Sequence, residues 1–178
     1  PYLVIRNLEG WRFLALHGMS IMKTYEPILL KNMSQPGYTG SLAEYERAGG
    51  YQALRNVLGK VSPAEVTAVV MQSGLRGRGG AGFPPGVKWG FLPKDYQGPR
   101  YLCCNADESE PGTFKDRQLI ERDPHQLLEG MLIACYAFGA ASYYIYIRGE
   151  FVLGAKILEA AIKEARTAGY IGKNILGT

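Results

Sequence analysis

The chain has 178 residues, enough for one domain to bury ~70% of its unfolded surface without a disulfide or metal. Its 47% hydrophobic and 20% charged residues exclude a disordered, collagen-like or coiled-coil protein. A formal net charge of +4 suits an anionic small molecule but is too small for a dedicated nucleic-acid-binding domain. The three cysteines have no metal-ligand spacing, which indicates a reducing compartment.

The first part of the chain is predicted to be irregular and then helical. Residues 1–40 show no clear period and are expected to form an extension that ends in a loop. The pattern Ser-x-x-Glu, which caps the first turn of a helix, occurs twice after this loop. The predicted helices open at Ser41 and end at Gly49, cover Tyr51–Leu58, and run from Ser62 to about Ser73.

The rest of the chain alternates between predicted strands and helices, after a long irregular stretch over residues 74–99. Buried strands are expected over Arg100–Cys104 and Tyr143–Ile147, and helices over Thr113–Arg122, Pro124–Phe138 and Phe151–Ala168. This alternation predicts a layered α/β fold. The uncharged run over residues 130–147 is long enough for a membrane span, but Gly139 divides it into the end of a helix and a strand.

A glycine-rich loop, residues 74–89, has the sequence GLRGRGGAGFPPGVKW. Five of its glycines fall within nine residues, so a ligand can approach the main-chain N–H groups closely. Arg76, Arg78 and Lys88 add cations, and this combination suits a phosphate. The loop contains G-x-G-x-x-G, but it follows a helix instead of a strand, and it lacks the Walker lysine pattern. The alternative is a merely flexible surface loop.

An acidic turn, residues 105–112, directly follows the first predicted strand, and ligands bind at the carboxyl ends of strands in α/β sheets. Its three carboxylates repel one another, and Arg76, Arg78 and Lys88 are candidates to balance them. Carboxylates and an amide can also accept hydrogen bonds from ribose hydroxyls. Alone, the turn would be interpreted as a solvated charge run. Next to the glycine-rich loop it favours a binding site, and we expect both segments to face one cavity.

Both segments belong to a longer set of motifs. They are SGLRGRGGAGFPPGVKW (73–89), CNADESEPGTFKDR (104–117), ERDPHQLLEG (121–130), YIYIRGEF (144–151) and GKNILGT (172–178). With this set, the chain from Leu42 to Thr178 resembles the 51 kDa family, which is the FMN- and NADH-binding flavoprotein of respiratory complex I (NADH:quinone oxidoreductase). The same module occurs in NAD-linked hydrogenases and formate dehydrogenases. Pro85 stands where the family usually has threonine.

The resemblance implies a Rossmann-like FMN-binding α/β domain over residues 41–178, incomplete and with a helical N-terminal segment. It implies that FMN phosphate and ribityl groups are held by Gly77, Arg78, Gly79, Gly80 and Lys88. Asn105, Asp107 and Glu108 would contact FMN. Glu110 would be the catalytic carboxylate between flavin and nicotinamide ribose. Phe83 and Phe91 would sandwich the adenine of NAD.

The resemblance further implies hydride transfer from NADH to FMN and onward transfer to iron–sulfur clusters. The partners would be a 2Fe-2S thioredoxin-like subunit and a large Fe-S subunit. The complex would place the protein on the cytoplasmic face of the cell membrane, or on the matrix side in mitochondria. The family's ubiquitin-like domain and the domain that binds [4Fe-4S] have no counterpart here, so an N-terminal fragment that is inactive alone is expected, with Met22 as a family-like start.

Three alternatives remain open at this point. The chain could be the flavin subunit of an NAD-linked hydrogenase or formate dehydrogenase. It could bind a nucleotide without turnover. The basic, aromatic-bearing loop could also bind single-stranded nucleic acid, although the acidic turn opposes this. No Ser/His/Asp or Cys/His constellation is present, and His125 is expected to be structural.

Overall fold

The computed structural model describes residues 2–7, 10–15, 27–93 and 95–177, and it divides into two compact units, Pro1–Lys31 and Asn32–Thr178. In the first unit, β1 (Tyr2–Asn7) pairs antiparallel with β2 (Gly10–Ala15). The sequence analysis predicted no element there, because the apolar residues of β1 are consecutive and do not alternate. Met22 lies outside the described residues.

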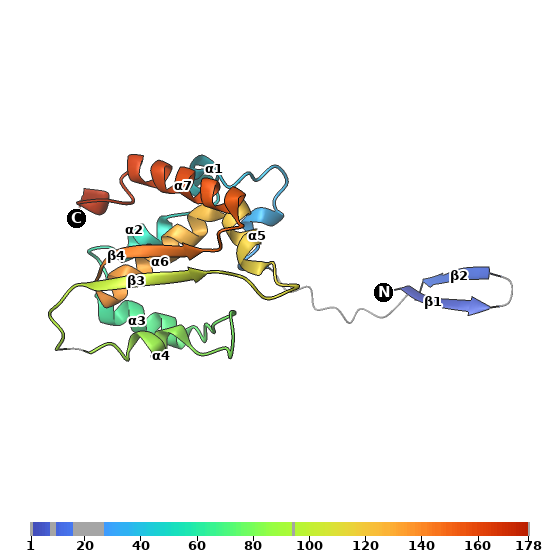
Figure 1. Cartoon of the computed structure of the whole chain (residues 1–178), viewed down its shortest axis with the longest axis horizontal. Helices are drawn as coiled ribbons and strands as arrows, with labels where there is room; N and C mark the ends of the chain where they lie inside the picture. Colours follow the sequence, from blue (N-terminus) through green and yellow to red (C-terminus); the bar gives the residue numbers. More distant parts are fainter. Residues whose placement is uncertain (1, 8–9, 16–26, 94, 178) are drawn as a thin grey trace. The chain divides into compact units, whose positions relative to one another are not determined.

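The second unit has the predicted α/β character (Figure 1). Its two strands are β3 (Arg100–Ala106) and β4 (Ala140–Ile147). Its helices are α1 (Leu42–Arg47), α2 (Gln52–Val57), α3 (Pro63–Gln72), α4 (Pro85–Trp89), α5 (Lys115–Arg122), α6 (Pro124–Phe138) and α7 (Val152–Thr167), with short 3-10 turns at Asn32–Ser34 and Ile175–Gly177. All helices predicted from caps and periodicity are confirmed, and α4 is an addition inside the stretch expected to be irregular.

The two capping patterns behave differently. At α3 the box forms, because Ser62 Oγ accepts the Glu65 N–H and the Glu65 carboxylate accepts the Ser62 N–H at 2.9 Å. At α1 the prediction of a box is wrong, although the helix starts at the expected place. The Glu44 carboxylate accepts hydrogen bonds from the N–H and hydroxyl of Thr39, at 2.6 and 2.5 Å, and so closes the preceding turn.

The sheet of the second unit is parallel, with Cys104 of β3 beside Ile145 of β4, and α6 connects the two strands. Alternation along β3 turns Leu102 and Cys104 inward and leaves Tyr101 and Cys103 exposed. The prediction of a fully buried strand is therefore wrong in the second unit as described, where one sheet face is solvent-exposed. Burial raises the pKa of the Cys104 thiol.

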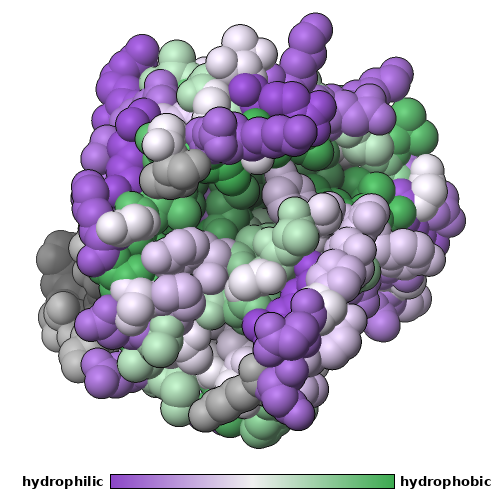
Figure 2. All heavy atoms as spheres, turned by 90° about the vertical axis from the view of Figure 1, so that its left-hand side faces the viewer, coloured by the Kyte–Doolittle hydropathy of each residue, from purple (hydrophilic) through white to green (hydrophobic). Residues whose placement is uncertain are grey.

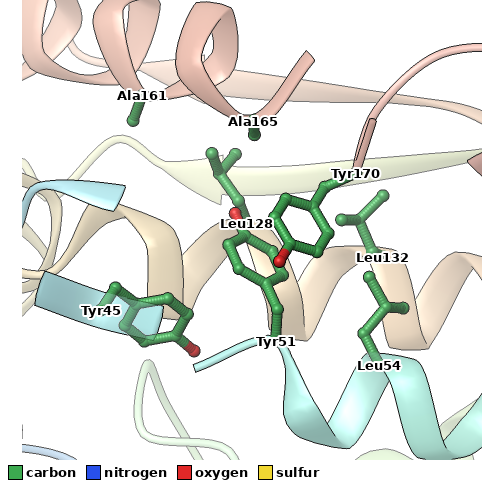
Figure 3. Close-up of a cluster of buried hydrophobic side chains, with 8 residues drawn as sticks. All are labelled: Tyr45, Tyr51, Leu54, Leu128, Leu132, Ala161, Ala165 and Tyr170. Carbon is green, nitrogen blue, oxygen red and sulfur yellow. The ribbon is translucent and has the colours of Figure 1, made fainter. Parts of the chain in front are cut away.

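The main core lies where α1, α2, α6 and α7 meet (Figure 3). Its fully buried centre is a stack of two tyrosines, Tyr51 and Tyr170, whose ring centroids lie 3.7 Å apart. Beside them, Glu129 of α6 accepts the backbone N–H groups of Tyr51 and Leu54 at 2.8 and 3.0 Å. This buried carboxylate ties the start of α2 to α6, and its hydrogen bonds compensate for its desolvation.

A cavity of about 420 Å³ lies at the amino end of β4. It includes Leu132, Ile162 and Ile171, and Figure 2 shows hydrophobic surface gathered in a hollow on one face of the molecule. The hydroxyl of Tyr143 is buried without a hydrogen-bond partner among the described residues, and burial raises its pKa to about 12. None of the described helices combines the length and apolar character needed to cross a membrane.

Candidate functional site

A larger cavity, of about 670 Å³, lies at the carboxyl end of β3, where the sheet ends and the acidic turn begins. It is lined by seven of the predicted site residues, Arg78, Gly79, Gly80, Asn105, Asp107, Glu108 and Glu110. Its volume falls in the range of ligand pockets. The glycine-rich loop and the acidic turn therefore face one cavity, as the sequence predicted.

The glycine-rich loop is held in shape by its own chain. Gly77 N–H donates to the Phe83 carbonyl at 3.0 Å, and Arg76 Nε donates to the Gly82 carbonyl at 2.9 Å. Gly82 has a φ of +70°, a conformation that favours glycine. Arg76 thus stabilises the loop, and it does not balance the acidic turn as we expected.

Gly79 and Gly80 lie at the cavity wall, and neither has a positive φ. A Cβ atom at either position would meet no heavy atom of the described protein within 4 Å. The protein's own packing therefore does not require glycine at these two positions. Close approach of a ligand to their main-chain N–H groups does require it.

The acidic turn is folded by short local contacts. Asn105 Oδ1 accepts the Asp107 N–H at 3.1 Å, and the Ser109 hydroxyl donates to the Asp107 carboxylate at 2.8 Å. Further along, the Glu110 carbonyl accepts the Thr113 N–H at 3.1 Å. These contacts fix the backbone next to the cavity and leave the Glu110 carboxylate exposed, without a partner among the described residues.

Glu108 is different, because only 8% of it is exposed and both carboxylate oxygens are engaged. They accept the backbone N–H groups of Asp116 and Arg117, at 2.8 and 3.1 Å. These donors belong to the first turn of α5, which has no other partners for them and favours a negative charge. Glu108 therefore joins the turn to α5.

The charges around the cavity do not pair as the sequence suggested. Within the part of the chain that the structure describes, no ion pair joins Arg76, Arg78 or Lys88 to the acidic turn. Lys115 contacts Asp116 instead. Four cavity residues were not singled out by the sequence analysis, although all lie in the quoted stretch 104–117: Ser109, Thr113, Lys115 and Asp116.

The other four predicted site residues, Gly77, Lys88, Phe83 and Phe91, do not line this cavity. Lys88 is exposed on α4. The rings of Phe83 and Phe91 contact each other, with centroids 5.9 Å apart and planes tilted by 49°. A base stacked between them needs two contacts of about 3.5 Å each, so the rings would have to separate to admit it.

Other chemistry-bearing residues are structural. His125 is fully buried away from the cavity, with Nδ1 at 3.0 Å from the Tyr51 hydroxyl and Nε2 at 3.0 Å from the Glu164 carboxylate. The three cysteines are free. The described residues contain no cluster of three or more His, Cys, Asp or Glu side chains that could hold a metal ion.

Comparison with known proteins gives a consistent match. Residues 70–176 match the family model described as the Nuo51 FMN-binding domain. The chain is 56% identical over 155 residues to an F-type subunit of the NADH-quinone oxidoreductase of Rhizobium meliloti, a match that covers 86% of this chain and 36% of that protein. It is 57% identical over 151 residues to the corresponding NADH-quinone oxidoreductase subunit of Aquifex aeolicus, covering 85% of this chain and 35% of that protein.

Solved structures agree with the sequence relatives. An NAD+-reducing [NiFe]-hydrogenase in its H2-reduced state is similar with a TM-score of 0.63 and 38% identity, over 76% of this chain and 24% of that chain. The same type of enzyme in its air-oxidized state gives a TM-score of 0.61 and 40% identity, over 72% and 23% of the two chains. The chain spans about a third of the length of the curated relatives it matches.

Proposed function

The chain belongs to the family of the Nuo51 FMN-binding domain, and from this premise we propose that it forms the flavin- and NADH-binding part of an NADH dehydrogenase. The observation that carries the proposal is the cavity shared by the glycine-rich loop and the acidic turn. We assign the cofactor-binding domain to residues 41–178, with residues 1–40 as an extension. Supporting the same function, the relatives named above are NADH-quinone oxidoreductase subunits.

The residues at the cavity fit FMN. Gly79 and Gly80 leave open space at their Cβ positions and offer main-chain N–H groups, and Arg78 adds a cation beside them. Such a combination of backbone donors and a cation is suited to the FMN phosphate. Asn105 and Asp107 carry oxygen acceptors for hydroxyl and ring N–H groups. The volume of about 670 Å³ is adequate for a mononucleotide.

In this proposal each residue binds or orients. When bound, FMN supplies the acceptor for two electrons and a proton from NADH, so the protein needs no nucleophile of its own. Glu110 is the catalytic carboxylate, because its side chain faces the cavity and is not engaged by the described protein. Glu108 holds the turn on α5 and presents its buried carboxylate at the cavity wall.

The remaining assignments rest on the family resemblance. Gly77 shapes the loop that carries the phosphate donors. Lys88 reaches the phosphate from α4, and Phe83 and Phe91 bind the adenine of NADH after their rings separate. Onward electron transfer goes to iron–sulfur clusters of neighbouring subunits, on the cytoplasmic or matrix face of the membrane. The [4Fe-4S] cluster of the family would have its ligands outside this chain.

A second candidate is the flavin subunit of an NAD-linked hydrogenase, because the similar solved structures are NAD+-reducing [NiFe]-hydrogenases. The cavity and the bound cofactors would be the same, and the electron acceptor would differ. Co-purification of the intact protein with its neighbours separates the two: a nickel–iron subunit indicates the hydrogenase, and quinone-reducing membrane subunits indicate the NADH dehydrogenase.

The decisive test fills the cavity from the glycine-rich loop. Gly80→Val adds a side chain into space that the protein leaves open, so we expect normal folding but at least a tenfold loss of FMN affinity through steric exclusion, a loss of about 1.4 kcal/mol or more. FMN affinity is measured by fluorescence titration of the intact protein, and folding by urea denaturation.

The matched control is Gly130→Val on α6, where a Cβ atom also meets nothing within 4 Å but no cavity is near. It should bind FMN like the parent. Equal FMN affinity in Gly80→Val and the parent would refute the assignment of the cavity.

A further inference from the structure

Arg148 follows β4 directly, at the same edge of the sheet as the acidic turn. The last residue pair of the sheet is Ala106 with Ile147, so the next residues are Asp107 on one chain segment and Arg148 on the other. The carboxyl ends of the two parallel strands therefore place a guanidinium beside a carboxylate. Arg148 belongs to the motif YIYIRGEF, which the proposed function has not yet used.

The guanidinium of Arg148 contacts both the turn and its own loop. Its Nη1 donates to the carbonyl of Ser109 at 3.5 Å. Its Nε and Nη2 donate to the two carboxylate oxygens of Glu150, at 3.0 and 3.1 Å. This bidentate pairing restricts the planar guanidinium to one orientation, and that orientation points Nη1 at the acidic turn.

The charge of Arg148 also opposes the repulsion within the turn. Asp107 and Glu110 are in the same short segment, with Glu108 between them. The pKa of Arg148 is raised above its usual value, mainly by the hydrogen bonds with Glu150 and in smaller part by the charge of Asp107. Arg148 thus interacts favourably with the carboxylate of Asp107 and, at the same time, with the Ser109 carbonyl.

We propose that Arg148 is a positioning residue of the nucleotide cavity, which holds Asp107 and Ser109 in their ligand-binding conformation while Glu150 orients its guanidinium. The proposal rests on the proposed flavin-binding function. Arg148 itself does not line the cavity, so it acts through the turn. It reaches from β4 what Glu108 reaches from α5, and the turn is held from both sides.

The test compares Arg148→Ala, Arg148→Lys and Glu150→Gln with the parent in the intact protein. FMN affinity is measured by fluorescence titration, and the flavin midpoint potential by spectroelectrochemistry. Since a hydrogen bond and a charge are lost, Arg148→Ala should weaken FMN binding about tenfold. Its midpoint potential should also fall, because a site that has lost a cation disfavours added electrons. Arg148→Lys keeps the charge without the fork, and Glu150→Gln keeps one hydrogen bond, so each should lose about threefold.

The matched control is Arg166→Ala, an exposed arginine on α7 that lines the cavity at the other end of the sheet. It should keep the parent's affinity and potential. If Arg148→Ala has the affinity and potential of Arg166→Ala, the positioning role is refuted, even where its stability is lower. If Arg148→Ala does not fold, unchanged FMN affinity in both Arg148→Lys and Glu150→Gln refutes it. A parent that binds no FMN would refute the proposed function as well, so the two failures are distinguishable.

Discussion

Glu108 shows how one side chain can differ from its motif-based assignment. The family resemblance assigned it to FMN, but both of its oxygens accept backbone N–H groups of α5. A carboxylate at a helix N-terminus forms charge-assisted hydrogen bonds with groups that otherwise have no partner. Glu108 therefore contributes to stability whether or not a ligand is bound. Its neighbour Glu110 has the same chemistry and no such contact among the described residues.

We expect Glu108→Gln to lower the free energy of unfolding by about 1–2 kcal/mol, because a neutral amide accepts the α5 N–H groups less well and loses the interaction with the helix dipole. Urea denaturation of the intact protein, followed by far-UV circular dichroism, measures this change.

The matched substitution Glu110→Gln should leave the stability within about 0.5 kcal/mol of the parent. It should instead raise the flavin midpoint potential, since a negative charge beside the cavity is removed. Equal stability losses in the two variants would contradict the distinction between the two carboxylates.

At the scale of elements, the placement of α4 depends on one glycine. A Cβ atom on Gly86 would lie 2.7 Å from the backbone nitrogen of Met71 in α3, closer than such atoms approach in proteins. The two helices therefore touch through their backbones. Because α4 carries Lys88, this contact also sets where that cation lies.

Gly86→Ala is expected to push α4 away from α3 and to destabilise the protein by about 1–3 kcal/mol through overpacking. The change is measured as the shift of the urea midpoint. Gly130→Ala on α6 meets nothing within 4 Å, so it should stabilise the protein by about 0.5–1 kcal/mol through higher helix propensity. A Gly86→Ala variant as stable as the parent would show that the helices separate easily.

At the scale of the whole molecule, the titrating carboxylates predict how stability depends on pH. Hydrogen bonds lower the pKa of Glu44 through Thr39, of Glu65 through Ser62, and of Glu150 through Arg148. A carboxyl whose pKa is lower in the folded state stabilises the protein above its unfolded pKa of about 4.3. Burial raises the pKa of Asp123, which has the opposite sign.

Three groups of the first kind oppose one of the second, so stability should fall as the pH drops from about 4.5 through the folded pKa values. Urea midpoints between pH 7 and pH 3 measure this dependence. In Glu65→Gln the amide keeps the cap without titrating, so the decline should become shallower. A midpoint that rises toward pH 3 would mean that Asp123 dominates.

The sequence by itself determined the local features of this protein. Caps and periodicity located α3, α6 and α7, and the density of glycine and carboxylates identified the two segments that line the cavity, because these signals depend on neighbours along the chain. Only the tertiary structure decided which strand positions pair, how Arg148 comes to lie beside Asp107, and that Glu108 caps α5. Those contacts join residues from separate elements, and they follow from how the helices and strands pack, which no local pattern encodes.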